Sequence, residues 1–185
     1  MAHKIIKDAE IRMDKAVEST RSELAKIRTG KATPALLDGV RVSYYGSSVP
    51  LSKVANINTP EPRLITIQPW EKNMIGEIEK AIQKSDLGLN PQNDGNLIRV
   101  PIPPLNEERR QDLIRLCRKL AEEGRVAVRN VRRDAIEHLK KEKKDGLISE
   151  DEEKKLEKEA QRLTDAHAAK IDEILKKKEA EIMEV

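Results

Sequence analysis

Residues 106–144 decide the fold, and they read NEERRQDLIRLCRKLAEEGRVAVRNVRRDAIEHLKKEKK. Asn106 is a favourable helix N-cap, and the two glutamates after it suit the first turn, where the helix dipole favours negative charge. Apolar residues recur at helical spacing until Asp145-Gly146 breaks the pattern; they are Leu113, Leu116, Leu120, Ala127, Val131, Ala135 and Leu139. The stretch therefore predicts one helix of about 39 residues, roughly 55 Å long at 1.5 Å per residue.

Two further helices are expected to cover its apolar side, because such a helix is not stable alone in water. The N-terminal segment has its own apolar pattern, which Gly30 and Pro34 end. Residues 149–152 have the form of a capping box, and a third pattern follows them. The two outer apolar rows are Ile6, Ala9, Met13, Ala16, Thr20, Leu24 and Ile27, and Leu156, Ala160, Leu163, His167, Ile171, Ile174 and Ile182. The short turn at 145–146 predicts an antiparallel three-helix bundle of residues 1–29 and 105–185.

The middle of the chain has a different pattern. All nine prolines fall between residues 31 and 104. Three short segments rich in β-branched residues, Val40–Tyr45, Leu64–Gln68 and Leu97–Ile102, predict strands, and residues 71–85 predict one amphipathic helix. We therefore expect residues 30–104 to form a small inserted β/α/β domain. The fold class is α+β, an elongated bundle carrying this insertion.

Two chain crossings would join the inserted domain to the bundle, both at one end of the expected rod. They fall near residues 30–31 and 101–105, where glycine and proline are concentrated. An elongated, L-like molecule with a hinge is expected. The hinge residues would be Gly30, Pro101, Pro103, Pro104 and Leu105.

Composition excludes several classes of protein. No segment approaches the roughly 18 apolar residues of a membrane span, and residues 1–15 lack the apolar core of a secretory signal. A single cysteine, Cys117, is consistent with a reducing compartment. We expect a cytoplasmic protein that does not contact membranes. Aromatic residues make up only 2% of the chain, so its cores are expected to be thin and lined by aliphatic residues.

No pattern in the chain indicates a reaction. There is neither a GxxxxGK(S/T) nor a GxGxxG loop to hold phosphate, and the three histidines lie far apart without CxxC or HxxxH companions. We therefore expect no catalytic residue, no metal and no cofactor. Tyr44, Tyr45 and Trp70 are interpreted as packing residues of the small domain, with a surface anchor as the alternative for Trp70.

Basic residues are divided unevenly between the two long C-terminal helices. Residues 105–133 contain eight arginines and one lysine, whereas residues 134–185 contain eleven lysines and one arginine. Arginine is the residue suited to bidentate phosphate contacts and to stacking on bases. The bias therefore indicates a nucleic-acid surface on residues 105–133.

Helical geometry places these arginines together. At 100° per residue, Arg125, Arg129, Arg132 and Arg133 lie within about 60° of Arg118, on the side away from the expected apolar row. No acid occurs between residues 125 and 133. A solvated face with incidental ion pairs is the simpler interpretation of a charge run, but the acid-free turn favours RNA.

Four motifs, in this order, resemble the ribosome recycling factor family. They are KIRTGKA at 26–32, SDLGLNP at 85–91, IRVPIPPL at 98–105 and VAVRNVRRD at 126–134, and the resemblance covers essentially the whole chain. It implies a three-helix bundle with a hinged β/α/β domain, similar in outline to a transfer RNA. It also implies a monomer that binds the post-termination ribosome and acts with elongation factor G to separate the subunits. The GTPase belongs to that partner.

The resemblance also implies where the RNA contacts lie. In the family the bundle lies along large-subunit ribosomal RNA through arginines of its second helix. These correspond most directly to Arg129 and Arg132, followed by Arg133, Arg125 and Arg110, and Arg28 lies in a matching motif at the end of the first helix. Arg118 is added from its position on the helix. The small domain and the hinge would face elongation factor G.

A coiled-coil adaptor or chaperone, gripping proteins with the inserted domain, is the alternative from another functional class. Charge reversal at Arg132 distinguishes the two hypotheses. It should abolish ribosome binding by a recycling factor and leave partner binding by an adaptor intact.

Overall fold

The computed structural model describes residues 3–184 of the chain. They divide into two compact units, with boundaries between Thr29 and Gly30 and between Leu105 and Asn106. One unit is helical and the other contains all the strands of the described residues. This confirms the α+β class, with a helical bundle and a small β-sheet domain.

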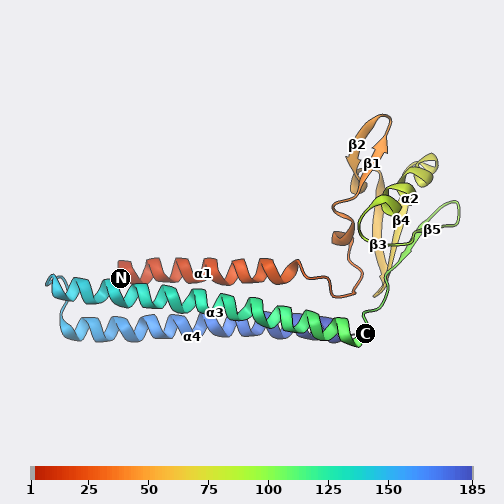
Figure 1. Ribbon diagram of the computed structural model, residues 1–185. Coiled ribbons are helices and arrows are strands. Elements are labelled where there is room, and N and C mark those ends of the chain that lie inside the picture. The colour runs from red at the N-terminus through yellow and green to blue at the C-terminus, as the bar shows by residue number, and fades with distance from the viewer. Residues whose placement is uncertain (1–2, 185) are drawn as a thin grey trace. The chain divides into compact units, whose positions relative to one another are not determined.

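Three helices lie side by side in the bundle: α1 (Lys4–Ala25), α3 (Glu107–Lys144) and α4 (Glu150–Met183) (Figure 1). The capping box at the start of α4 is formed, because Ser149 Oγ accepts from the Glu152 amide at 3.1 Å and the Glu152 carboxylate accepts from the Ser149 amide at 3.1 Å. Asn106 Oδ1 accepts from the Arg109 amide at 2.7 Å, as expected for the N-cap of α3. Local capping therefore fixes where both long helices begin.

The buried side of α3 differs from the expected one. Leu116 is 42% exposed, and Leu120 and Ala127 are only half-buried. The buried residues of α3 are Leu113, Ile114, Cys117, Ala121, Gly124, Val128, Val131, Ala135 and Leu139. Small residues dominate this row because α3 contacts both α1 and α4. An apolar count that looks for large residues misses such positions.

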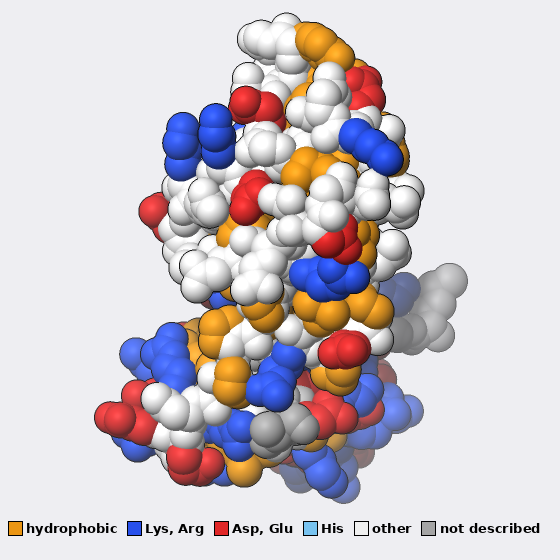
Figure 2. All heavy atoms as spheres, turned by 90° about the vertical axis from the view of Figure 1, so that its right-hand side faces the viewer, with side chains coloured by type: hydrophobic (Ala, Val, Ile, Leu, Met, Phe, Trp, Pro, Cys, Tyr) orange, Lys and Arg blue, Asp and Glu red, His pale blue; other side chains and the backbone are white. Residues whose placement is uncertain are grey.

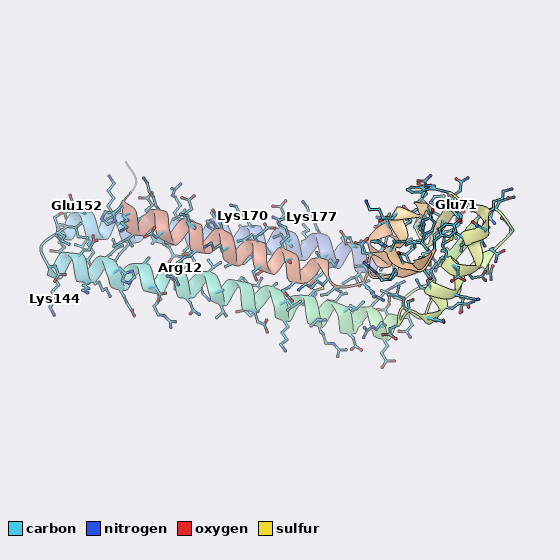
Figure 3. All side chains as sticks on the ribbon, turned by 90° about the horizontal axis from the view of Figure 1, so that it is seen from above. Arg12, Glu71, Lys144, Glu152, Lys170 and Lys177 are labelled. Carbon is cyan, nitrogen blue, oxygen red and sulfur yellow. The ribbon has the colours of Figure 1, made fainter. Side chains whose placement is uncertain are left out.

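The first helix shows a smaller correction of the same kind. Val17 is buried where Ala16 was expected, and Ile27 lies beyond the end of α1 and is half-buried. The two outer helices are joined to α3 by pairs such as Arg12 and Asp134, whose Nη2 and Oδ2 are 2.8 Å apart (Arg12 is labelled in Figure 3). The bundle core contains no aromatic residue.

The small domain has a four-stranded antiparallel sheet in the order β3-β4-β6-β5 and a separate two-stranded sheet. Its elements are η1 (Pro34–Leu37), β1 (Arg41–Tyr44), β2 (Ser47–Pro50), η2 (Leu51–Lys53), β3 (Ala55–Glu61), β4 (Leu64–Pro69), η3 (Lys72–Met74), α2 (Ile75–Lys84), β5 (Gln92–Asn93) and β6 (Ile98–Pro101). The expected strands correspond to β1, β4 and β6. Three others, β2, β3 and β5, were missed, since they are short or rich in polar residues.

Alternation of side chains builds the core of this domain. Ile65 pairs with Val100 and Ile67 with Ile98 across β4 and β6, and all four side chains are fully buried. The apolar side of α2, formed by Ile75, Ile78 and Ile82, belongs to the same buried cluster. The fully buried side chains are aliphatic here as well, so the expectation that aliphatic residues line the cores is confirmed.

Only one of the aromatic residues packs against a core. Tyr44 is half-buried against the core of the small domain, as interpreted, whereas Tyr45 is 74% exposed and Trp70 is 61% exposed. The interpretation of Tyr45 and Trp70 as packing residues was therefore wrong.

Candidate RNA-binding surface

Three arginines of α3, Arg118, Arg125 and Arg132, flank the buried side of the helix, whereas Arg133 lies nearly opposite it. With the buried row centred on Cys117, Ala121 and Val128, the direction of Arg118 is about 90° from the centre of that row. The expectation that the arginines point directly away from the core is therefore corrected for Arg118, Arg125 and Arg132. These three each contact a residue of α4.

Two of the arginines form ion pairs with α4. Arg118 Nε is 2.7 Å from Glu179 Oε1, and Arg125 Nη1 is 2.6 Å from Asp172 Oδ1. The hydrogen bond and charge of Glu179 raise the pKa of Arg118. Glu179 lies 61 positions from Arg118 along the chain, and Asp172 lies 47 positions from Arg125. The sequence between residues 125 and 133 therefore gave no sign of either acid.

A third carboxylate, Glu122, holds two arginines at once. Arg125 Nε donates to its Oε2 at 2.9 Å, and Arg129 Nη2 donates to its Oε1 at 2.6 Å. The hydrogen bond from Arg129, followed by that from Arg125, lowers the pKa of Glu122. The spacing of Glu122 and Arg125, three residues apart on a helix, was a readable signal for this pair. Glu122 thus lies just before the acid-free segment 125–133, and its carboxylate accepts hydrogen bonds from two arginines of that segment.

Arg132 and Arg133 keep their charge uncancelled. Arg132 Nη1 donates to the neutral Gln161 Oε1 at 2.9 Å. In the described part of the chain, Arg133 has no carboxylate partner, and the acid that follows it, Asp134, is bound by Arg12. A neutral partner orients a guanidinium group without competing for its charge. These two residues are the arginines of α3 best prepared to meet phosphate.

The two remaining candidates lie elsewhere on the bundle. Arg110 is near the start of α3, about 22 Å along the helix from Arg125. Its side chain is 14% exposed, its Nη1 is 3.9 Å from Glu107, and its Nε is buried without a hydrogen-bond acceptor. Arg28 is exposed and lies just beyond the end of α1. The structure therefore gathers Arg118 to Arg133 into one row and leaves Arg28 and Arg110 apart from it.

No group of three or more His, Cys, Asp or Glu side chains that could hold a metal ion occurs in residues 3–184. None of the helices in the same residues has the length and hydropathy that crossing a membrane would need. The chemistry that this surface offers is recognition by charge.

Comparison with known proteins identifies the relatives of the chain. A family model described as ribosome recycling factor matches residues 20–183. The chain belongs to the ribosome recycling factor family. Members of this family are translation factors without catalytic activity of their own, and the coiled-coil adaptor alternative is not favoured. Ribosome recycling is therefore the function of the family to which the chain belongs.

Individual relatives match along their full length. The chain is 57% identical over 180 residues to the ribosome-recycling factor of Rubrobacter xylanophilus, covering 97% of each protein. It is 55% identical over 185 residues to that of Symbiobacterium thermophilum, covering all of both. The motifs singled out above therefore lie within a match that extends over the whole chain.

Solved structures agree. The solution structure of a ribosome recycling factor matches with a TM-score of 0.73 and 46% identity over all of both chains. A second match, with a TM-score of 0.62 and 49% identity over 97% of each chain, is the recycling factor of T. thermophilus. That protein was placed with E. coli elongation factor G on the E. coli post-termination complex.

Proposed function

We propose that the arginine row of α3 binds large-subunit ribosomal RNA when this factor occupies the post-termination ribosome. The row consists of Arg118, Arg125, Arg129, Arg132 and Arg133, with Arg28 and Arg110 as outlying contacts. The observation that carries the proposal is the uncancelled charge of Arg132 and Arg133, beside three arginines held in place by carboxylates. Guanidinium groups oriented before binding lose less entropy when they meet phosphate.

The partner that acts with it is elongation factor G, as for the T. thermophilus relative on the post-termination complex. The factor would act as a monomer in the cytoplasm, and GTP hydrolysis would belong to the elongation factor.

The hinge is part of the same proposal. Gly30 has a φ of +78°, and a Cβ there would lie 3.1 Å from Leu105 Cγ. The two chain segments that form the proposed hinge therefore meet at these residues. Pro101 belongs to β6, where it pairs with Leu64. Residues 103–105 follow the sheet and precede α3. Rotation would therefore be concentrated near Gly30 and residues 103–105, which elongation factor G would exploit.

The test is sedimentation of the protein with isolated large subunits over a salt series. Arg132→Glu and Arg133→Glu should each weaken binding at least tenfold at low salt, because a like charge then faces phosphate. Each should also reduce the slope of log affinity against log salt by about 1. Neither substitution leaves a buried acid unpaired, so folding should be retained.

Arg162→Glu is the matched control. Arg162 lies on α4 of the same bundle, and its side chain is 76% exposed. Its Nη2 is 3.8 Å from Oε1 of Glu159, the acid with which it pairs. It should bind large subunits as the unmodified protein does. Equal losses for Arg132→Glu and Arg162→Glu would mean that net charge, and not the α3 row, governs binding.

A further inference from the structure

The chain has only three aromatic residues, all in the small domain, and two of them donate hydrogen bonds to one carboxylate. They are Tyr44, Tyr45 and Trp70, and the carboxylate is that of Glu71. We call these four residues the Glu71 surface; Glu71 is labelled in Figure 3. Tyr44 is partly buried and packs against the core of the small domain, whereas Tyr45 and Trp70 are exposed.

Hydrogen bonds hold the Glu71 surface in a fixed arrangement. The Tyr44 hydroxyl donates to Glu71 Oε1 at 2.7 Å, and the Tyr45 hydroxyl donates to Oε2 at 2.9 Å. The two tyrosine rings meet edge to face, with centroids 4.6 Å apart. The hydrogen bond to Glu71, with a smaller effect of burial, raises the pKa of Tyr44. Tyr44 therefore stays a donor throughout the physiological range.

Trp70 is fixed independently. It follows the last residue of β4 and precedes Glu71, and its Nε1 donates to Asn56 Oδ1 on β3 at 3.1 Å. Its ring nevertheless remains 61% exposed, and the Tyr45 ring 74% exposed. Tyr45 is also the one non-glycine residue in the described chain with positive φ, at 47°. Two large rings are therefore held rigid and in water, which contributes little to the stability of the domain.

Rigid, exposed Trp and Tyr side chains are typical of protein–protein contacts. Such residues supply large contact areas and lose few rotamers on binding, and they dominate the energetic hot spots of interfaces. The charge of Glu71 indicates what lies opposite. Its two oxygens accept from neutral hydroxyls, and within residues 3–184 no Lys or Arg forms an ion pair with it. A carboxylate without a cationic partner, beside the exposed ring of Tyr45, attracts a cationic side chain and repels phosphate.

The composition of the domain supports a protein partner over RNA. Residues 30–105 contain eight Lys or Arg and seven Asp or Glu. The face of the small domain visible in Figure 2 carries scattered charges of both signs and no continuous basic area. Nucleic-acid surfaces instead gather positive charge.

We propose that the Glu71 surface docks a basic segment of a protein partner. A Lys or Arg of that segment meets the Glu71 carboxylate, and its aliphatic stem packs on the exposed ring of Tyr45. This inference rests on the proposed function only in that the ribosomal complex supplies the partner. It adds a second contact, of different chemistry, to the arginine row of α3.

Site-specific photocrosslinking identifies the occupant. A benzoylphenylalanine placed at Trp70 keeps an aromatic ring at that position. The labelled protein is irradiated on 70S ribosomes, alone and with elongation factor G and a non-hydrolysable GTP analogue. A crosslink to a protein segment containing Lys or Arg supports the proposal. Crosslinks only to ribosomal RNA, crosslinks to a segment without Lys or Arg, or none in either state overturn it.

Charge variants provide the energetic test. Glu71→Lys should slow subunit separation at least tenfold, as expected for loss of a central interface residue, and Glu71→Gln should slow it less. Glu61→Lys is the control, because Glu61 is an exposed acid at the end of β3 in the same domain. A Glu71→Lys protein as active as Glu61→Lys would refute the docking role.

Reversal of the crosslinked partner residue completes the design. Replacing that Lys or Arg by Glu should restore activity to Glu71→Lys, and failure to do so would contradict a direct ion pair. All variants should bind isolated large subunits normally, since the α3 row is unchanged. Loss of large-subunit binding by the unmodified protein would instead reject the proposed function, so the two failures are distinguishable.

Discussion

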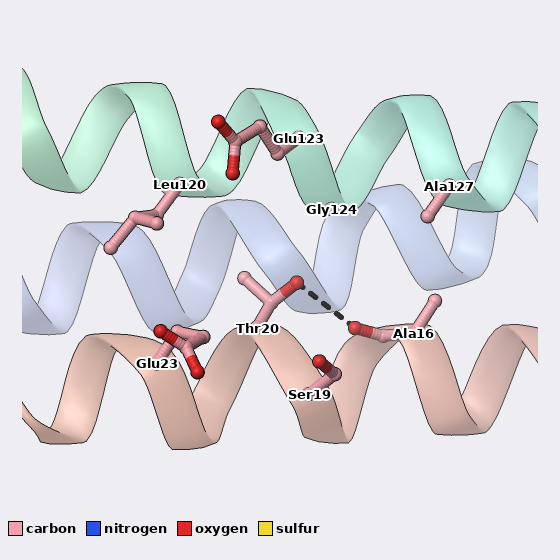
Figure 4. A pocket seen from close by; sticks show the side chains of 8 residues that line it. All are labelled: Ala16, Ser19, Thr20, Glu23, Leu120, Glu123, Gly124 and Ala127. Carbon is pink, nitrogen blue, oxygen red and sulfur yellow. Dashed lines mark hydrogen bonds between the residues drawn. The ribbon is translucent and has the colours of Figure 1, made fainter.

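Gly124 of α3 lies against Thr20 of α1, and replacing it by alanine tests how the bundle is packed. A Cβ at this position would overlap the Thr20 hydroxyl oxygen and would lie 3.2 Å from both Thr20 Cβ and Ile171 Cδ1. The Thr20 hydroxyl is held in place, because it donates to the Ala16 carbonyl at 2.9 Å (Figure 4). The added methyl group therefore meets atoms from both neighbouring helices.

Two opposing effects decide the sign. Alanine is favoured over glycine inside a helix by roughly 1 kcal/mol. Overpacking a well-packed core costs about 1–3 kcal/mol. The Thr20 side chain borders a groove between α1 and α3, lined also by Ala16 and Leu120, so it has some room to turn away. We expect Gly124→Ala to destabilise the bundle by about 1 kcal/mol.

Urea unfolding followed by circular dichroism at 222 nm measures this change, because the bundle supplies most of the helix. Thr20→Ala is the partner variant, since it removes the hydroxyl that the new methyl group would overlap. In the Thr20→Ala background, Gly124→Ala should cost less than in the unmodified protein, or should stabilise by up to about 1 kcal/mol. An increase in stability of about 1 kcal/mol for Gly124→Ala alone would refute the close-packing argument.

Three further outcomes are expected. Val128→Ala should lower the free energy of unfolding by about 2 kcal/mol in the same urea assay, because Val128 is fully buried. Leu116→Ala should lower it by less than about 1 kcal/mol, because Leu116 is 42% exposed. Hydrogen bonds from Arg99 and from two backbone amides hold the pKa of Asp94 at about 2. The Asp94 carboxylate should therefore stabilise the small domain at pH values above its usual pKa near 3.8, and this stabilisation should be lost as the pH falls towards 2. NMR titration of the unmodified protein, with Asp94→Asn as the control, measures the pKa. An Asp94 pKa near 3.8 would contradict the prediction. Glu122→Gln should tighten binding to large subunits severalfold, and unchanged affinity in the sedimentation assay would show that Glu122 does not compete with phosphate.

The sequence was sufficient for the elements that local chemistry specifies. The N-cap at Asn106, the capping box at Ser149 and the alternation in β4 and β6 each depend on residues a few positions apart. It was insufficient where tertiary contact decides. Gly124 is buried because α1 approaches closely, and no pattern within α3 distinguishes it from a helix-weakening glycine.

The candidate site shows the same division. The clustering of the α3 arginines followed from helical geometry, but Asp172 and Glu179 come from a different helix and carry no local signal. The aromatic residues were misread for a related reason. Tyr45 and Trp70 resemble core residues by type, and only the three-dimensional position of Glu71 reveals that hydrogen bonds hold them at the surface.

The carboxylates beside the arginine row have a consequence for how a recycling factor works. In the proposed binding of the α3 row to ribosomal RNA, phosphate would have to compete with Glu179, Asp172 and Glu122 for three of the arginines. Each of these contacts would then contribute less than an unpaired guanidinium would. The same pairs keep the side chains ordered between rounds, which limits the entropy lost on rebinding. In the same proposal, attraction at long range would depend mainly on Arg132 and Arg133, whose charge is uncancelled, and these two should dominate the association rate and its dependence on salt.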